Sequence, residues 1–294
     1  MNSKQALRDL LWAGDLSSYK VYLDALEKMD SLPVEAELQA KNYMEEETGN
    51  EFQGYGYMMQ KVDATAVMDV SGSLIAKSNW LTRIFGMTGY DEIQAAAVSA
   101  TQEPGIEHLL MDIDSPGGRV NGLAEATDVL KEIDAKIMPV SAFSSGSMHS
   151  AAMWLGSAAR EIHGTEMASF GSIGVIATHM EYSKEMEEQG VKATVFAAGK
   201  YKKIGNPFEP LSASDKEYIQ AQLDTAYGFF INAISDNRGL SEKHVREKAA
   251  DGRTFYAQDA REVGLIDQLS SFTDVVKLLN SSHNSQNHPQ QGGI

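Results

Sequence analysis

From residue 63 onward, short apolar strands alternate with segments of helical spacing, and this alternation limits the fold more than any other feature. Strand-like β-branched and apolar residues make up ATAVMDVSGSL, IEHLLMDID, MPVSAF, EIHG, ASFGSIGVIA and ATVFAAG. Helical spacing is found in DEIQAAAVSATQE, VNGLAEATDVLKEID, a segment beginning near His149, MEYSKEMEEQG, 212–237, EKHVREKAADG and QDAREVGLID. Strands that alternate with helices favour an α/β fold with a largely parallel sheet.

The same pattern divides the chain into three parts. Residues 1–60 are polar, with apolar residues at helical spacing, and predict a helical N-terminal arm that ends in a linker. Residues 61–270 hold the alternating pattern and form the expected main domain. Residues 271–294 predict a short helix followed by a polar tail, which from Ser281 has the low complexity typical of disorder.

Composition excludes several classes of function. The chain has no cysteine, which rules out disulfides, thiolate metal sites and a cysteine nucleophile. A net charge of −16 speaks against nucleic acid as a partner, because phosphate binding needs a basic surface. Neither a signal peptide nor an apolar run of about 18 residues is present, so we expect a cytoplasmic protein without a membrane partner. No metal-ligand motif appears, and no cofactor is expected.

Two turns follow successive strands and could serve acyl transfer, which needs a hydroxyl nucleophile opposite backbone N–H donors. In the first, DSPGG, Gly117 and Gly118 let the backbone approach another chain closely. The second is rich in serine, and Ser150 differs from the others because two small residues follow it at the start of a helix. Ordinary strand-to-helix connections have the same composition, and Ser145 and Ser147 compete with Ser150 on the residues alone.

A serine nucleophile also needs a base. Histidine is the usual one, and His179 is a candidate, with Asp224 to orient it. A lysine serves if burial lowers its pKa from about 10.4 to about 7 or 8, at a cost of about 3–4 kcal/mol. The cluster GKYKKI, which contains Lys200, Lys202 and Lys203, follows an apolar strand where such burial can occur. A solvated basic loop has the same composition.

Taken in order, five motifs resemble peptidase family S49, of the signal peptide peptidase A type, within the Clp protease/crotonase fold group. They are DSPGG, the S-A-A that begins at Ser150, GSIGV at 171–175, the G-x-x-K of 199–202, and DGR with AQDAREVGLID at 251–267. The similarity spans roughly residues 64–269. It implies a ClpP/crotonase-like fold of repeated β-β-α units and a serine peptidase activity.

The resemblance also implies a role for each matching residue. Ser150 corresponds to the nucleophile of the family and Lys202 to its general base, which together form a Ser–Lys dyad. The N–H groups of Gly118 and Ala151 fall on the oxyanion hole. The family often has two glycines after the serine, where this chain has Ala151 and Ala152, which keep the site small.

Further expectations follow for substrates and partners. Gly117 and Gly118 are expected to contact the substrate, and Ser172 to help position the lysine. The arm and the stretch VSGSLIAKSNWLTRIFGMTGYDEI resemble the bacteriophage branch of the family, the prohead or capsid maturation proteases. This similarity implies scaffold, portal or capsid proteins as substrates. It also implies a homo-oligomeric ring, in which some relatives share the dyad between subunits.

Other functions stay open at this point. They are a cellular-type S49 peptidase that degrades signal or other peptides, a Clp-like Ser-His-Asp protease using His179 and Asp224, a crotonase-type acyl-CoA enzyme, and a non-catalytic assembly scaffold. The crotonase reading uses the glycine-turn oxyanion hole without a serine nucleophile.

Overall fold

A computed structural model of the 294-residue chain describes residues 12–14, 19–20, 23–24, 55 and 57–286. Its main element is a six-stranded sheet in the order β13-β10-β8-β6-β3-β2. Neighbouring strands in it are parallel except for β2 and β3. The strands are β2 (Met59–Val62), β3 (Thr65–Ser71), β6 (His108–Asp114), β8 (Val140–Ser144), β10 (Glu161–Gly164) and β13 (Gln268–Leu269).

Each of three central strands is followed by a short strand and then a helix. After β3 come β4 (Ser73–Ile75), α4 (Trp80–Ile84), β5 (Met87–Gly89) and α5 (Tyr90–Ala100). After β6 come β7 (Gly117–Arg119) and α6 (Leu123–Lys136), and after β8 come β9 (Ser147–His149) and α7 (Ala151–Gly156). The short strands form two small sheets, β1-β7-β4-β5 and β12-β11-β9. Their remaining members are β1 (Trp12–Gly14), β11 (Ser169–Gly171) and β12 (Thr254–Tyr256). The predicted α/β fold of repeated β-β-α units is confirmed.

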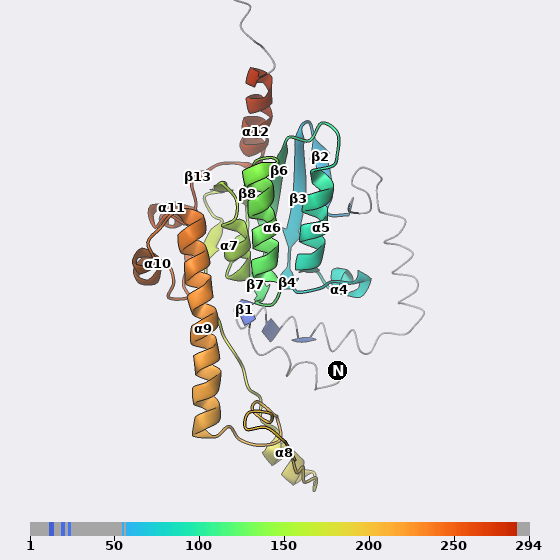
Figure 1. The fold of residues 1–294 in the computed structure, drawn as a ribbon, viewed down its shortest axis with the longest axis vertical. Coiled ribbons are helices and arrows are strands. Elements are labelled where there is room, and N and C mark those ends of the chain that lie inside the picture. Colours follow the sequence, from blue (N-terminus) through green and yellow to red (C-terminus); the bar gives the residue numbers. More distant parts are fainter. Residues whose placement is uncertain (1–11, 15–18, 21–22, 25–54, 56, 287–294) are drawn as a thin grey trace, which may run out of the picture.

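Alternating residues along the strands face two different cores. In β3 and β6, residues such as Met68 and Met111 pack against the side that α5, α6 and α7 cover, as Figure 1 shows. Val67 and Leu110 point to the opposite face, where they pack against α12 (Phe272–Gln286). Both faces of the sheet are therefore partly covered, as expected for parallel strands with long apolar runs.

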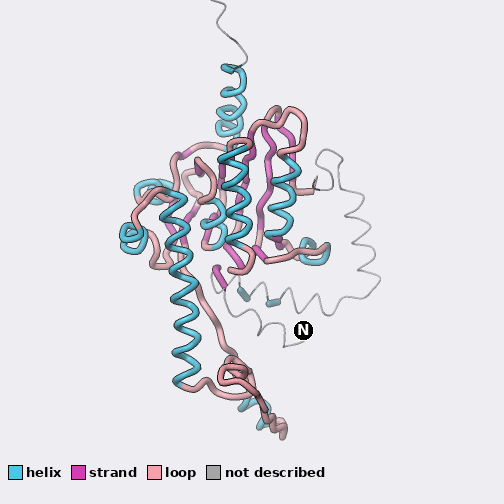
Figure 2. The backbone as a smooth tube through the Cα atoms, in the orientation of Figure 1, coloured by secondary structure: helices cyan, strands magenta, loops and turns pink. Residues whose placement is uncertain are grey.

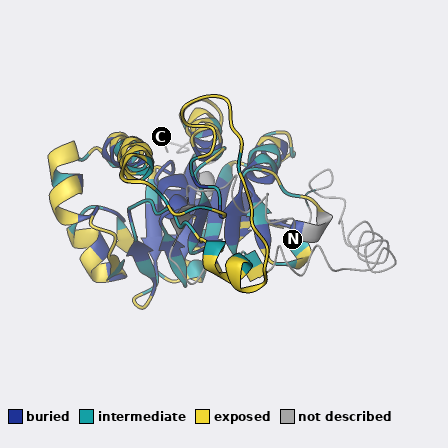
Figure 3. Ribbon diagram, turned by 90° about the horizontal axis from the view of Figure 1, so that it is seen from below, coloured by how far each residue is buried: buried dark blue, intermediate teal, exposed yellow. Residues whose placement is uncertain are grey.

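A long helix and the segment before it extend away from this body. Only the second half of α9 (Ala213–Arg238) contributes buried side chains, among them Phe230. Residues 177–212, here called the projecting segment, include the fully unburied helix α8 (Ser183–Glu188). Figures 1 and 2 show α8 near the end of α9 that is remote from the sheet, and Figure 3 shows its exposure. Two further helices, α10 (Glu242–Lys248) and α11 (Ala257–Glu262), follow α9.

Three expectations about local structure were wrong. ATVFAAG, residues 193–199, is not a strand, because it lies in the projecting segment and pairs with no other strand of the described chain. Helix α12 continues to Gln286, past the point where the tail was expected to become disordered. Residues 12–14, expected to be helical, form β1 because their backbone pairs with β7. Residues 19–20 and 23–24 are helical, and the rest of the expected arm before residue 55 lies outside the described residues.

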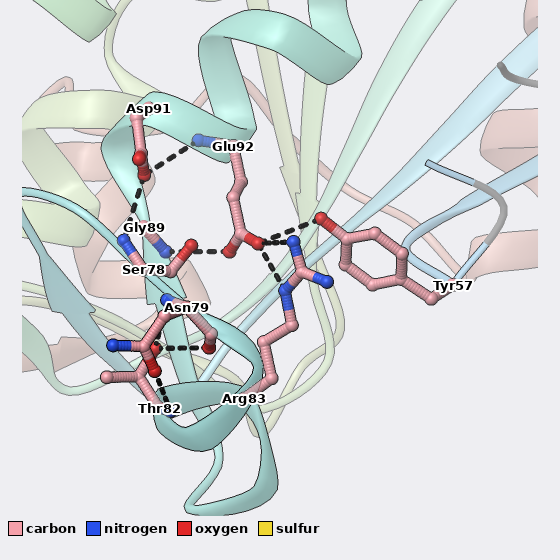
Figure 4. Close-up of polar contacts among 8 residues, drawn as sticks. All are labelled: Tyr57, Ser78, Asn79, Thr82, Arg83, Gly89, Asp91 and Glu92. Atoms are coloured by element: carbon pink, nitrogen blue, oxygen red, sulfur yellow. Dashed lines mark hydrogen bonds and ion pairs between the residues drawn. The ribbon is translucent and has the colours of Figure 1, made fainter. Parts of the chain in front are cut away.

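Buried Glu92 holds together the segment between β4 and α5, which contains α4 and β5 (Figure 4). Its Oε1 atom accepts hydrogen bonds from the Tyr57 hydroxyl at 3.0 Å and from the Arg83 guanidinium. Its Oε2 atom accepts from the Gly89 backbone N–H at 3.3 Å, which caps α5. Burial raises the pKa of Tyr57 to about 12, so its hydroxyl stays protonated as a donor. These contacts hold α4 and β5 in place beside β4, the strand that supports β7.

No helix in the described part of the chain combines the length and apolar content required to cross a bilayer.

One acidic pair lies on the less covered face of the sheet. Asp69 and Asp112 are direct partners in the β3–β6 ladder. Burial raises the pKa of Asp112 to about 6, and the charges of Asp69 and Asp114 add to the effect. The folded chain therefore holds a proton that the unfolded chain has lost, so stability falls as pH rises from about 4 to about 6.

Replacing Asp112 with asparagine is accordingly expected to stabilise the protein at pH 8 but not at pH 4. Because the side chain is only half-buried, solvent screening limits the gain to about 1 kcal/mol, or about 2–4 °C in Tm. Thermal unfolding at both pH values measures it. Asp128→Asn on the exposed face of α6 controls for the lower net charge. Equal gains at pH 4 and pH 8 would contradict the assignment.

Candidate functional site

The two turns singled out in the sequence are hydrogen-bonded to each other. The Ser115 N–H donates to the Ser147 carbonyl at 2.7 Å, and the His149 N–H donates to the Ser115 carbonyl at 3.1 Å. Asp114 Oδ1 accepts from the Ser147 N–H at 2.9 Å, and Ser115 Oγ accepts from the Gly117 N–H at 3.1 Å. The DSPGG turn is therefore fixed beside the strand that leads to Ser150.

Both glycines of the first turn are required by geometry. Gly117 has a φ of 98°, a conformation that residues with a Cβ rarely adopt. At Gly118, a Cβ would lie only 2.0 Å from the Leu74 carbonyl oxygen, because β7 runs directly against β4 there. Because Gly117 and Gly118 have no side chains, another backbone can closely approach the edge of β7 that faces away from β4.

Replacing Gly118 with alanine is expected to lower the free energy of unfolding by about 1–3 kcal/mol, because the added methyl group forces β7 away from β4. Chemical denaturation measures the change. Gly228→Ala on α9 is the matched control, since its Cβ would meet no atom within 4 Å and alanine favours a helix. Unchanged stability of Gly118→Ala would contradict the close packing.

Ser150 stands at the junction between β9 and α7 in a conformation uncommon for a residue with a side chain. Its φ is 51° and its ψ −120°, and its backbone N–H donates to the Gly171 carbonyl at 2.7 Å. The residue is only 1% exposed, and its hydroxyl lies 3.4 Å from the Gly174 carbonyl oxygen. Such backbone conformations are concentrated at functional sites, where the surroundings hold them in place. Ala151 follows it, buried in the first turn of α7, whose N–H groups the helix itself does not use.

A cavity of about 520 Å³ lies next to Gly174, and Ser150 itself does not line it. Its lining includes Ser172 and Gly174, the middle of α9 from Gln220 to Tyr227, and the turn at 250–252. Ser172 also has a positive φ, of 53°, and its N–H donates to the Arg253 carbonyl at 2.7 Å. The cavity is connected to the nucleophile candidate through Gly174, which accepts the Ser150 hydroxyl.

Lys202 is separated from these residues in the single chain. It is exposed within the projecting segment, where its N–H donates to the Gly199 carbonyl at 3.1 Å. Its neighbour Tyr201 stacks on Tyr218 near the start of α9, with ring centroids 4.6 Å apart. Phe230, which packs against α7, lies on α9 roughly 18 Å farther along at 1.5 Å per residue. The fold thus brings together Gly117, Gly118, Ser150, Ala151 and Ser172, and it holds Lys202 apart.

The two neighbouring lysines have partners that favour their charged forms. A contact with the Tyr201 hydroxyl raises the pKa of Lys200, and a hydrogen bond to Glu209 raises that of Lys203. Both effects oppose the neutral form that a general base requires.

The alternative triad is not assembled in this chain. His179 Nε2 lies 3.0 Å from the Asn206 carbonyl within the projecting segment. Asp224 accepts from Gln220 at 2.7 Å. The ring of His149, adjacent to the serine, contacts Ser169 at 2.8 Å. Among the contacts of the described residues, none joins His179 to Asp224 or to Ser150.

Two backbone contacts of the site were missed by sequence reasoning. Gly171 and Gly174 hold the N–H and the hydroxyl of Ser150 through their carbonyls. The GSIGV motif that contains them was noticed. Every residue has a backbone carbonyl, however, so the residue type does not indicate which carbonyl will accept a hydrogen bond from Ser150.

Comparison with known proteins gives related sequences over most of the chain. A family profile described as "Peptidase family S49" matches residues 132–286. Capsid assembly protease C of Escherichia phage lambda is 32% identical over 80% of this chain and 53% of its own length. Head-tail preconnector protein GP5 of Enterobacteria phage P21 is 32% identical over 76% and 44%. The chain spans about half the length of these relatives. Among solved structures, a ClpP1 mutant from Listeria monocytogenes aligns with a TM-score of 0.45 and 12% identity, over 71% of this chain and 94% of that one.

Proposed function

Because the chain belongs to peptidase family S49, we propose that it is a serine endopeptidase in which Ser150 is the nucleophile and Lys202 the general base. The observation that carries the proposal is the environment of Ser150. A buried serine with a positive φ lies at a strand-to-helix junction, and hydrogen bonds fix that strand to a double-glycine turn. Both residues lie within the range that the family profile matches, 132–286.

The chemistry follows from these groups. Ser150 Oγ attacks the scissile carbonyl carbon while its proton passes to the neutral Lys202 amine. The N–H groups of Gly118 and Ala151 stabilise the oxyanion, an effect worth about 3–4 kcal/mol per donor in enzymes of this kind. Lys202 then donates the proton to the leaving amine as the peptide bond breaks. Water, deprotonated by the same lysine, hydrolyses the acyl-enzyme and regenerates the Ser150 hydroxyl.

The lysine in this scheme comes from a neighbouring subunit. A lysine loses its proton near neutral pH only when burial disfavours its charge. Lys202 is exposed in the single chain, next to Tyr201, which stacks on Tyr218 near the start of α9, so a second copy must provide both the burial and the nearby serine. The projecting segment also carries exposed apolar side chains, including Phe196 at 90% exposure, which favour contact with another protein surface. A homo-oligomeric ring satisfies both requirements. Within it, Ser172, which lines the cavity next to Gly174, is the proposed residue that helps to position the lysine.

The proposed substrates are scaffold, portal or capsid proteins of an assembling phage head in the host cytoplasm. The support is the similarity to a capsid assembly protease and to a head-tail preconnector protein, each matched over about half its length.

Incubation with an unstructured protein substrate tests the reaction class. New α-amino groups and shortened fragments are expected, without turnover of acyl-CoA thioesters. Thioester turnover without new amino groups would replace the proposal with a crotonase-type reaction. If the assembled oligomer forms no new amino groups and turns over no thioester, a non-catalytic assembly role would replace the proposal.

A further inference from the structure

The chain's own N-terminal segment lies on the strand that carries Gly118. Residues Trp12–Gly14 form β1, which pairs antiparallel with β7, and Ala13 is opposite Gly118 in the register. The other edge of β7 is taken by β4, where Leu74 is the partner of Gly118. In the sheet order β1-β7-β4-β5, β1 therefore fills the edge of β7 that β4 leaves free. Figure 1 shows β1 close to β7.

A second contact holds the same segment near the site. Tyr19 is only 7% exposed and packs in a cluster with Ile75 and Met87. Ile75 ends β4 and Met87 begins β5, so Tyr19 is anchored on the same small sheet that β1 extends. Partly buried Ile176 also packs against this cluster and lines the cavity next to Gly174, whose carbonyl accepts the Ser150 hydroxyl. The strand pairing and the tyrosine anchor are independent observations that place the segment on the candidate active site.

An extended peptide binds a strand edge through its backbone, by adding one more strand to the sheet. Beside the oxyanion donor Gly118, the edge suited to a substrate backbone is the one that β1 covers. We propose that the segment Trp12–Gly14, anchored by Tyr19, is an autoinhibitory strand that must leave β7 before an extended protein substrate can bind. This inference rests on the proposed peptidase function.

The short length of β1 limits how strongly it can inhibit substrate binding. A three-residue strand makes few backbone hydrogen bonds, each worth about 0.5–1.5 kcal/mol net. Attachment to the same chain gives such a strand an effective concentration in the millimolar range. It therefore competes with a substrate but is displaced by one that binds more tightly, and its release is expected to change KM several-fold and to leave kcat unaltered.

The test uses full-length variants. Ala13→Pro removes a backbone N–H and disfavours the strand, whereas Ala13→Ser keeps both the N–H and the small size. Tyr19→Ala removes the anchor without altering β1. Two quantities are measured: KM and kcat for an extended peptide substrate, and hydrogen exchange of the amides at 117–119. Exchange over β3 and β6 checks that the fold is intact.

Ala13→Pro and Tyr19→Ala are expected to lower KM by about 2- to 10-fold, consistent with a millimolar tethered competitor, and to speed exchange at 117–119. Ala13→Ser should match the wild type. A synthetic peptide of residues 8–18, added to Ala13→Pro, should raise KM again and slow the same amides.

Unchanged KM and exchange in Ala13→Pro would overturn the inference. Cleavage of the segment in the wild type but not in Ser150→Ala would also overturn it, since the segment would then be a substrate. Faster exchange in a chain that hydrolyses no peptide would instead refute the proposed function, and with it the inhibitory role, while leaving the pairing of β1 with β7 intact.

Discussion

Replacing Ser150 with alanine is expected to reduce peptide hydrolysis by a factor on the order of 10⁴–10⁶, because removing a serine nucleophile leaves only binding and oxyanion stabilisation. The fold should be retained, since among the described residues the side chain makes only one hydrogen bond, at 3.4 Å, worth about 1 kcal/mol. Hydrolysis of a protein substrate, thermal unfolding and oligomer size are measured on the same preparation.

Ser145→Ala is the matched control for this variant. Ser145 lies in the same serine-rich turn but is exposed, so its replacement should leave the rate close to that of the wild type. Near-normal hydrolysis by Ser150→Ala, or loss of activity in Ser145→Ala with the fold intact, would assign the nucleophile elsewhere.

Replacing Lys202 with alanine is expected to reduce hydrolysis by about 10²–10⁴-fold, the usual contribution of a general base. Lys202→Arg should be equally impaired, because a guanidinium stays charged and cannot accept the serine proton. Lys200→Ala and Lys203→Ala should be mild, since the contacts of both lysines favour the charged form. The rate of hydrolysis is measured as a function of pH for all four variants. If Lys200→Ala abolished hydrolysis and Lys202→Ala did not, the general base would be Lys200, two positions earlier in the chain.

Mixing the inactive chains tests whether the dyad is shared. If each Ser150 uses Lys202 of a neighbour, a mixed oligomer of Ser150→Ala and Lys202→Ala chains regains up to about a quarter of the wild-type activity, because some interfaces bring two intact residues together. Reassembly from equimolar dissociated subunits measures this recovery. Complete absence of recovery in mixed oligomers would place both residues of the dyad in one chain.

The sequence predicted the parts of the fold that local patterns determine. Buried strands such as β3 and β6 are apolar along their length, and the helices between them have clear spacing. Ser150 and Gly118 were predicted as site residues because both follow buried strands, in turns of which one carries glycines and the other a serine followed by small residues. The structure brings these two turns together through the Ser115–Ser147 contact.

Features set by distant partners were not predictable in the same way. Residues 193–199 have the composition of a strand but no strand beside them, and composition cannot report a missing partner. The pairing of β1 with β7 joins residues about a hundred positions apart and has no local signal. The surroundings proposed for Lys202 involve a second chain, so neither the sequence nor the fold of one subunit can report them.

The central claim, that Ser150 is an activated nucleophile, is tested most directly by reacting the full-length oligomer with a fluorophosphonate and locating the adduct by peptide mass spectrometry. The account predicts one adduct, on Ser150, formed far more slowly in Lys202→Ala. An adduct on another serine, or continued peptide hydrolysis without any adduct at Ser150, would contradict it.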